Sequence, residues 1–115
     1  MKTRYGWIEI GGVQYDHDVV IHRDRSVDRR SKKRSKKLKK VFGHTPLSSS
    51  EIAFLEAERP EIVYIGTGHH NCLPITLDAL KILSNYESII RPTPEVLESL
   101  RDEIRSFVAI LHVSC

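Results

Sequence analysis

The sequence predicts a single α/β domain over residues 1–115, with three layers in the order β/β/α. An N-terminal antiparallel meander is expected to pack with a small, mostly parallel sheet and with helices. The first observation behind this prediction is the chain length of 115 residues, which is typical of one domain. The other two are patterns: the first third alternates β-forming runs with turn residues, and the remainder alternates helical and strand-like segments.

The expected meander consists of short strands that are separated by turn signals. Gly11 and Gly12 form a two-residue hairpin signal, and residues 23–26 form a second turn signal. The predicted strands of the meander are Tyr5–Ile10, Val13–Tyr15, His17–His22 and Val27–Arg29.

From residue 47 onward, helical and strand patterns alternate three times. Ser48 and Glu51 have the spacing of a capping box, and Pro60 closes the helix that they open. Thr93 and Pro94 open the last helix as its cap and its first residue. The predicted elements are a helix at 48–60, a strand at 62–65, a helix at about 75–85, a strand at 88–91, a helix from 93 and a strand at 107–113.

Apolar positions in these elements predict the core. The second helix is expected to turn one broad apolar face inward, and the third to repeat apolar residues at helical spacing. The two continuous apolar strands are expected to be buried on both faces. The helix residues concerned are Leu77, Leu80, Ile82, Leu83, Val96, Leu97, Leu100 and Ile104. The strand residues are Ile62, Val63, Ile65, Phe107, Ala109, Ile110 and Leu111.

The excess of positive charge in the chain is confined to one segment. The net charge is +3, but residues 29–40 contain nine Lys or Arg and no acidic residue, and the other 103 residues carry 9 basic and 15 acidic side chains. We expect this segment to be exposed. Its charge fits weak electrostatic contact with nucleic acid, although it lacks aromatic residues for base stacking. The candidate nucleic-acid residues are Arg29, Arg30, Lys32, Lys33, Arg34, Lys36 and Lys37. The alternative is a solvated segment that balances the acidic remainder.

The loop at residues 66–74 is the main candidate for a ligand site. It follows a predicted buried strand, begins with Gly-Thr-Gly and leads into a helix, so its backbone N–H groups could face an anion. The alternative is that the glycines only form a tight turn, because the motif lacks the further residues of a dinucleotide or P-loop signature. The tentative ligand-binding residues are Gly66, Thr67, Gly68, His69, His70 and Cys72.

Two further candidates for chemistry are the thiol of Cys72 and the carboxylates of Asp16 and Asp18. Cys72 as a nucleophile would need a lowered thiol pKa, and the alternative is a small apolar residue. Asp16 and Asp18 share one face of a strand and could act as a carboxylate pair, or sit at a turn where one accepts from backbone donors. We expect no metal, no cofactor and no membrane span. Two cysteines do not form a disulfide framework, so we expect reduced thiols and a cytoplasmic location.

Four segments resemble a family of small archaeal and bacterial proteins of unknown function: Tyr5–Gly12, Tyr15–Asp18, Ile65–Gly68 and His112–Cys115. The eukaryotic relatives of that family are the adipogenesis-associated domain protein and a mitochondrial complex I assembly factor. The resemblance covers nearly the whole chain. It implies a three-layer β/β/α domain and an interaction or assembly role, and it supplies no catalytic residues.

The leading functional prediction is therefore a non-catalytic interaction or assembly module with a protein partner, with a homo-oligomer as one form. The first alternative is a binding protein or enzyme for an anionic small molecule at the 66–74 loop. The second is weak nucleic-acid binding through 29–40.

Overall fold

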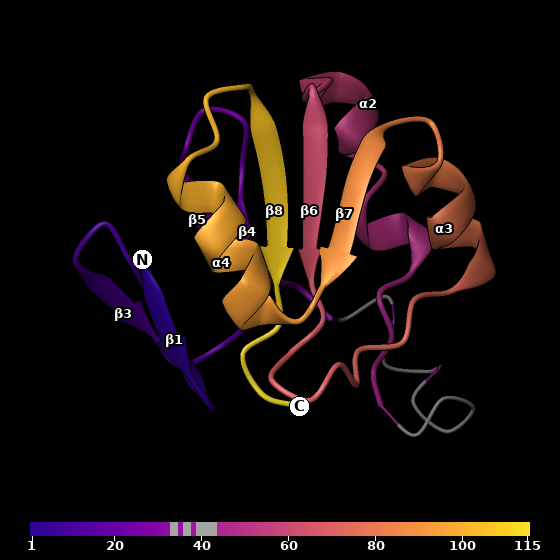
Figure 1. Ribbon diagram of the computed structural model, residues 1–115. Coiled ribbons are helices and arrows are strands. Elements are labelled where there is room, and N and C mark those ends of the chain that lie inside the picture. The colour runs from indigo at the N-terminus through magenta and orange to yellow at the C-terminus, as the bar shows by residue number, and fades with distance from the viewer. Residues whose placement is uncertain (33–34, 36–37, 39–43) are drawn as a thin grey trace.

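A five-stranded mixed sheet forms the centre of the protein. The computed structural model describes residues 1–32, 35, 38 and 44–115. The strand order is β5 (Val27–Arg29), β4 (Val19–Ile21), β8 (Phe107–Leu111), β6 (Ile62–Gly66) and β7 (Glu87–Arg91). Strand β6 pairs in parallel with both β7 and β8, and β4 pairs antiparallel with β8 and β5. The parallel strands therefore end at one common edge (Figure 1).

The expected meander is divided between two sheets. Strands β1 (Lys2–Arg4), β2 (Trp7–Ile10) and β3 (Val13–Tyr15) form a separate antiparallel sheet, in which Gly11 and Gly12 make the predicted hairpin turn at positive φ. Strand β1 was not predicted. Strands β4 and β5 instead extend the central sheet. Strand β4 is buried at Val19 and Ile21 and half-buried at Val20, so both of its faces need cover, which a terminal hairpin does not provide.

The predicted helix at 48–60 is not continuous. A 3₁₀ turn covers Ser49–Glu51, and helix α2 covers only Leu55–Glu58. Between them the backbone of Ile52 leaves the helical region, with φ −114° and ψ 9°, and Arg59 ends α2 in the left-handed conformation. The two short elements bury Ile52 and Leu55 completely.

The other two helices form where the sequence predicts them, but their apolar faces are narrower. In α3 (Leu77–Leu83), Ala79 and Leu83 are buried, whereas Leu77 is 84% exposed and Leu80 is 40% exposed. Helix α4 (Thr93–Arg101) buries Val96, Leu97 and Leu100 and ends before Ile104, which is 94% exposed. The inward orientation predicted for Leu77, Leu80 and Ile104 is wrong. None of the described helices is long and apolar enough to cross a membrane.

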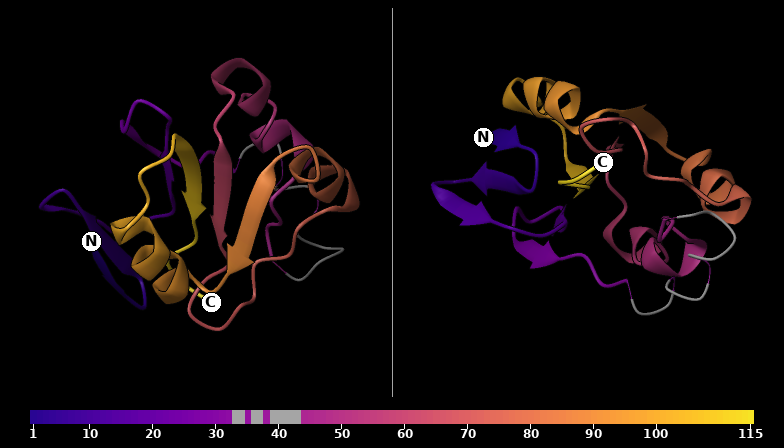
Figure 2. Two further views of the ribbon diagram at one scale, coloured as in Figure 1. Left: turned by 45° about the horizontal axis from the view of Figure 1, so that its top comes forward. Right: turned by 90° about the horizontal axis from the view of Figure 1, so that it is seen from below.

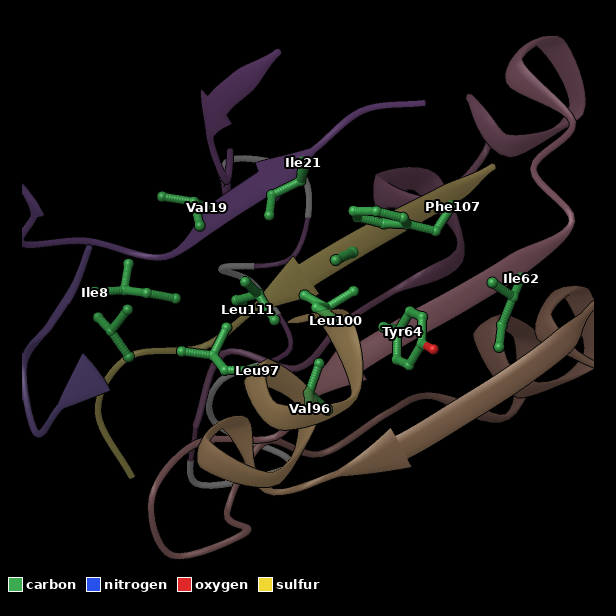
Figure 3. Packing of buried hydrophobic residues seen from close by; sticks show 12 residues of the cluster. Ile8, Val19, Ile21, Ile62, Tyr64, Val96, Leu97, Leu100, Phe107 and Leu111 are labelled. Carbon is green, nitrogen blue, oxygen red and sulfur yellow. The ribbon is translucent and has the colours of Figure 1, made fainter. Parts of the chain in front are cut away.

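The central sheet separates two hydrophobic clusters, which gives the predicted three layers. Alternate residues of β6 and β8 point to opposite faces: Tyr64 and Ala109 face one cluster, and Val63 and Ile110 face the other. Helix α4 and Ile8 of the small sheet cover the first face (Figure 3). The 3₁₀ turn, α2 and α3 cover the second face, and Figure 2 shows α4 and α2 on opposite sides. All seven strand residues predicted to be buried are buried.

The buried position of Ile110 gives a direct test of this layering. Ile110→Ala removes a side chain that is enclosed between β8 and the helices of the second face, so we expect unfolding to become easier by about 2–5 kcal/mol. The matched control is Ile104→Ala in the exposed segment after α4, with an expected effect within about 0.5 kcal/mol. Urea denaturation measures both. Equal effects of the two variants would contradict the assignment of β8 to the centre of the sheet.

Candidate functional site

The chemistry of the protein gathers at the edge where the parallel strands end. Asp18 directly precedes β4, Arg30 directly follows β5, and His112 directly follows β8. Because β4 runs antiparallel to β5 and β8, the start of β4 lies at the same edge as the ends of those two strands. The 66–74 loop leaves β6 at this edge too, beside the C-terminal segment (Figure 1).

Asp18 is the centre of a buried polar network. Its Oδ2 accepts from Arg30 Nη1 at 3.0 Å and from His112 Nδ1 at 2.8 Å, and its Oδ1 accepts from the Val113 N–H at 2.9 Å. Lys32 Nζ lies 3.4 Å from Oδ2. Burial alone would raise the pKa of the Asp18 carboxyl, but the hydrogen bonds from His112 and Val113 and the charge of Lys32 hold that pKa well below its ordinary range.

Arg30 joins this network to the 3₁₀ turn. Its Nε and Nη2 donate to the two carboxylate oxygens of Glu51, at 2.6 and 3.0 Å, and Nη2 also donates to the Pro46 carbonyl at 3.0 Å. Ser35 Oγ donates to Glu51 at 2.6 Å. Burial opposes the charge on Arg30, but the two carboxylates outweigh it, so the pKa of the guanidinium is raised. The side chain is 2% exposed. The prediction of an exposed Arg30 is therefore wrong, because a buried carboxylate pair holds it.

Two clefts open on either side of Arg30. The larger has a volume of about 680 Å³, and the smaller, about 280 Å³, lies toward the 3₁₀ turn. Arg30 and Ser31 line both. The residues lining the larger cleft, called the network cleft below, are Gly6, Asp16, His17, Asp18, Arg29, Arg30, Ser31, Lys32, Val113 and Ser114.

His112 connects the network to the wall of the network cleft. Its Nδ1 faces Asp18, and its Nε2 lies 3.3 Å from Ser114 Oγ. Because an ionised carboxylate can only accept, Nδ1 carries a proton; in the neutral imidazole, Nε2 then presents a lone pair to the hydroxyl. Sequence analysis noted the His112–Cys115 segment only for its resemblance. The spacing of His112 and Ser114, which puts both on one face of an extended chain, was the available signal.

The carboxylates of Asp16 and Asp18 do not have equivalent roles. Asp18 accepts from a backbone N–H, as expected for a residue at a turn, and its carboxylate is fully enclosed by donors. Asp16 lines the cleft. His17 lies between them in sequence and places its Nδ1 3.0 Å from the Asp18 carbonyl oxygen, while its ring meets Tyr15 edge-on.

The N–H groups of the glycine loop bond within the protein. Those of Thr67 and Gly68 donate to the Arg91 carbonyl at 2.9 Å and to Thr93 Oγ1 at 3.0 Å. Those of His69 and His70 donate to the carbonyls of residues 114 and 115, both at 2.8 Å. Of the two alternatives for this loop, these contacts match the tight turn, and the N–H groups of residues 67–70 do not converge on an external anion.

The side chains of the loop are arranged for packing. Thr67 is buried, and His69 places Nε2 3.2 Å from Thr3 Oγ1, so it connects the loop to the small sheet. Partial burial, together with the neighbouring His70, lowers the pKa of His69. His70 is exposed. Desolvation raises the pKa of the Cys72 thiol, the direction opposite to that of an activated nucleophile.

The remaining candidates are dispersed. Arg29 is exposed at the end of β5, and Lys32 forms an ion pair with Asp18. Leu38, in the same basic segment, is half-buried. Lys33, Arg34, Lys36 and Lys37 lie outside the described residues. In the part of the chain that the structure describes, no three His, Cys, Asp or Glu side chains gather as a metal site. Cys72 and Cys115 are both free thiols.

These features define a class: a small three-layer α/β domain with a polar cleft at one end of a mixed sheet. The structure of PH1505 from Pyrococcus horikoshii OT3 is 30% identical, with a TM-score of 0.86, and the match covers 100% of this chain and 98% of PH1505. MT938 is 28% identical, with a TM-score of 0.79 and coverage of 100% and 96%. No family model and no curated protein matches the chain.

The chain belongs to the family of conserved hypothetical proteins that includes PH1505. This agrees with the predicted resemblance to a family of small archaeal proteins. PH1505 is described only as a conserved hypothetical protein, so the comparison assigns a fold and a family but no activity.

Gly68 tests whether the loop is built for packing. It has φ +98°, and a Cβ there would lie 2.1 Å from the backbone carbon of Cys115. Gly12 also has positive φ, +83°, but open space around it. We expect Gly68→Ala to lower the free energy of unfolding by about 1–3 kcal/mol more than Gly12→Ala, because only Gly68 adds a clash to the backbone strain. Thermal denaturation measures both, and equal losses would contradict the close approach of the C-terminal segment.

The Asp18 network predicts a pH dependence of stability. Because the pKa of Asp18 is depressed in the folded protein, its contribution is complete above the unfolded value of about 3.9, declines below that value, and is gone once the pH has fallen through the depressed folded value. We expect Asp18→Asn to cost about 3–5 kcal/mol at pH 7, since it leaves Arg30 with one carboxylate fewer.

The loss of unfolding free energy caused by Asp18→Asn should be smaller at pH 3 than at pH 7, by about 1 kcal/mol. Denaturant titrations at both pH values measure it, with Asp102→Asn at the exposed end of α4 as the control. A deficit that is the same at both pH values would contradict an ionised, stabilising Asp18.

Proposed function

We propose that the protein binds a small anionic molecule in the network cleft. The observation that carries this proposal is that the buried carboxylate of the cleft is already paired within the protein, whereas two cations of the cleft remain accessible. Asp18 is fully engaged by Arg30, His112 and Val113, so it does not repel an anion as a free carboxylate would. Arg29 and Lys32 remain as cations on the wall, against the one other carboxylate of the lining, that of Asp16.

The positions of these two cations support anion binding. Lys32 is 38% exposed and approaches Asp18 at 3.4 Å, so its ammonium group is held at the cleft while it can still contact a ligand. Arg29 is exposed, and no carboxylate of the described residues forms an ion pair with it. A carboxylate or phosphate between the two would gain charge-assisted hydrogen bonds. The cleft lies at the sheet edge where β5 and β8 end and β4 begins, so the two cations stand beside the enclosed Asp18.

This proposal moves the anionic ligand away from the 66–74 loop. The backbone groups of that loop bond to Arg91, Thr93 and the C-terminal segment, so a ligand there would have only side chains to contact. The network cleft keeps the same ligand class and supplies cations that the loop lacks.

Inorganic phosphate is the probe for this proposal. In a ¹H–¹⁵N titration at constant ionic strength, we expect saturable shifts at the amides of Ser31, Lys32 and Val113. Lys32→Met should weaken binding by about tenfold, the value of one charge-assisted contact, and Lys81→Met on the exposed side of α3 should not. Unsaturated shifts spread over surface lysines would overturn the proposal, and saturable shifts confined to residues 66–74 would return the ligand to the loop.

An interaction or assembly module is the second candidate. The side chains of Leu77 and Leu80 favour it, because they lie one helical turn apart on α3 and remain exposed. Helix α3 lies next to β7, an edge strand of the central sheet (Figure 1). A second copy of this chain is the first partner to test. Light scattering that gives a monomer mass across a wide concentration range would exclude that form of the candidate.

Three narrower predictions accompany these candidates. The first is binding of nucleic acid through residues 29–40. Arg30 is buried and cannot contact a nucleic acid, so this binding would depend on Arg29, Lys32 and basic residues outside the described part. A functional relation to the two eukaryotic proteins and a cytoplasmic location also stay predictions. Removal of the charges at 29 and 32 should flatten the salt dependence of any binding to nucleic acid, and unchanged binding would reject this segment as the interface.

A further inference from the structure

We infer that Ser114, His112 and Asp18 form a nucleophilic site in the network cleft, and that its substrate is a small carboxylic ester bearing an anionic group. The substrate class rests on the anion binding proposed above, whereas the nucleophile rests on the geometry of the three side chains. Ser114 Oγ lies 3.3 Å from His112 Nε2, and His112 Nδ1 lies 2.8 Å from Asp18 Oδ2. These contacts connect a hydroxyl, an imidazole and a carboxylate in the order that acyl transfer by serine requires.

The chain positions the three groups by simple means. His112 and Ser114 are two residues apart on the extended segment after β8, so their side chains lie on the same face. Asp18 comes from the start of β4, which pairs with β8. Val113, between the two reacting residues, donates its N–H to Asp18 Oδ1, so the carboxylate is fixed to the same segment that carries the nucleophile.

Each group has a distinct role in the reaction. Asp18, held ionised by its surroundings, keeps the proton of His112 on Nδ1 and orients the ring. His112 Nε2 takes the hydroxyl proton as Ser114 Oγ attacks the ester carbonyl carbon. The carbon–oxygen bond to the alcohol breaks, and His112 returns the proton to that alcohol. Water then attacks the acyl-serine with His112 as base, which releases the acid and restores the Ser114 hydroxyl.

The cleft provides the other requirements of acyl transfer. Ser114 and Asp18 line the same space of about 680 Å³, so a substrate in the cleft has access to the hydroxyl. The ammonium group of Lys32, which lies 3.4 Å from Asp18 Oδ2, lines the same cleft as Ser114 and supplies positive charge to the space in which the carbonyl oxygen becomes negative. Lys32 thus makes the cleft favourable for the anionic substrate and for the negative charge that develops on it.

A purely structural network would need Asp18 and His112 but not the Ser114 hydroxyl. Labelling by a fluorophosphonate separates the two cases, because this reagent reacts with activated serines. We expect mass spectrometry to locate one adduct on Ser114, formed at least about a hundredfold faster than any adduct on exposed Ser84 in the same molecule, well within the range by which a base activates a hydroxyl. Ser114→Ala should abolish the adduct and Ser84→Ala should not.

His112→Gln should slow the labelling of Ser114 by about a hundredfold, with circular dichroism confirming the fold. If that variant does not fold, the ratio of the labelling rates of Ser114 and Ser84 in the wild-type protein still tests whether Ser114 is activated. Absence of label on Ser114, or equal labelling of both serines, would overturn the nucleophilic site.

The same experiment keeps this inference separate from the binding proposal. Inorganic phosphate should slow the labelling of Ser114 in wild type, because it competes for the cleft. Labelling that phosphate does not affect would leave the nucleophile in place and overturn the anionic substrate class. Saturable phosphate-induced shifts in the cleft without labelling of Ser114 would support anion binding and overturn the nucleophilic site. Hydrolysis of 4-nitrophenyl hemisuccinate, an anionic ester, should be faster than that of 4-nitrophenyl acetate and should depend on Ser114 and Lys32.

Discussion

The rest of this end of the molecule depends on one constraint, which is the burial of the Asp18 carboxylate. A buried charge is tolerated only when donors surround it, and Asp18 has three within 3.0 Å, from Arg30, His112 and the Val113 N–H. Burial of Arg30 in turn requires Glu51, which fixes the 3₁₀ turn. A single carboxylate therefore connects β4, the end of β5, the end of β8 and the second helical layer, and the network cleft opens where these segments meet.

A second feature explains why the cleft opens on the β4–β5 side of this edge. Strands β6 and β7 are followed by connections to opposite faces of the sheet, an arrangement that commonly leaves a crevice between strand ends. Here Thr93 closes that position, since its hydroxyl donates to the His112 carbonyl at 2.6 Å and accepts from the Gly68 N–H. The glycine loop folds over the C-terminal segment and uses its own donors. The remaining space lies on the other side of β8, next to Ser114.

The local patterns of the sequence predicted much of the fold but little of the site. Continuous apolar runs identified β6 and β8, and Gly11–Gly12 identified the hairpin, because each pattern reflects a requirement met within a few residues. The prediction of a continuous helix at 48–60 was wrong because Glu51 bonds to Arg30, 21 residues away, and the chain bends to bury Ile52 and Leu55. Gly-Thr-Gly was correctly placed at a strand end, but the partners of its N–H groups lie as far away as residue 115.

The sequence by itself determined most of the strands, the turns, the three-layer α/β class and the concentration of basic residues at 29–40, because alternation, glycine and charge act locally. The tertiary structure decided which of these charges are buried and which side chains meet. Arg30 and Asp18 are 12 residues apart, and His112 and Asp18 are 94 apart. No local pattern encodes such distances. Pairing of β4 with β8 brings Asp18 to His112, and the cost of a buried charge then selects Arg30 as the enclosed residue among Arg29, Arg30 and Lys32, the basic residues at 29–40 that the structure describes.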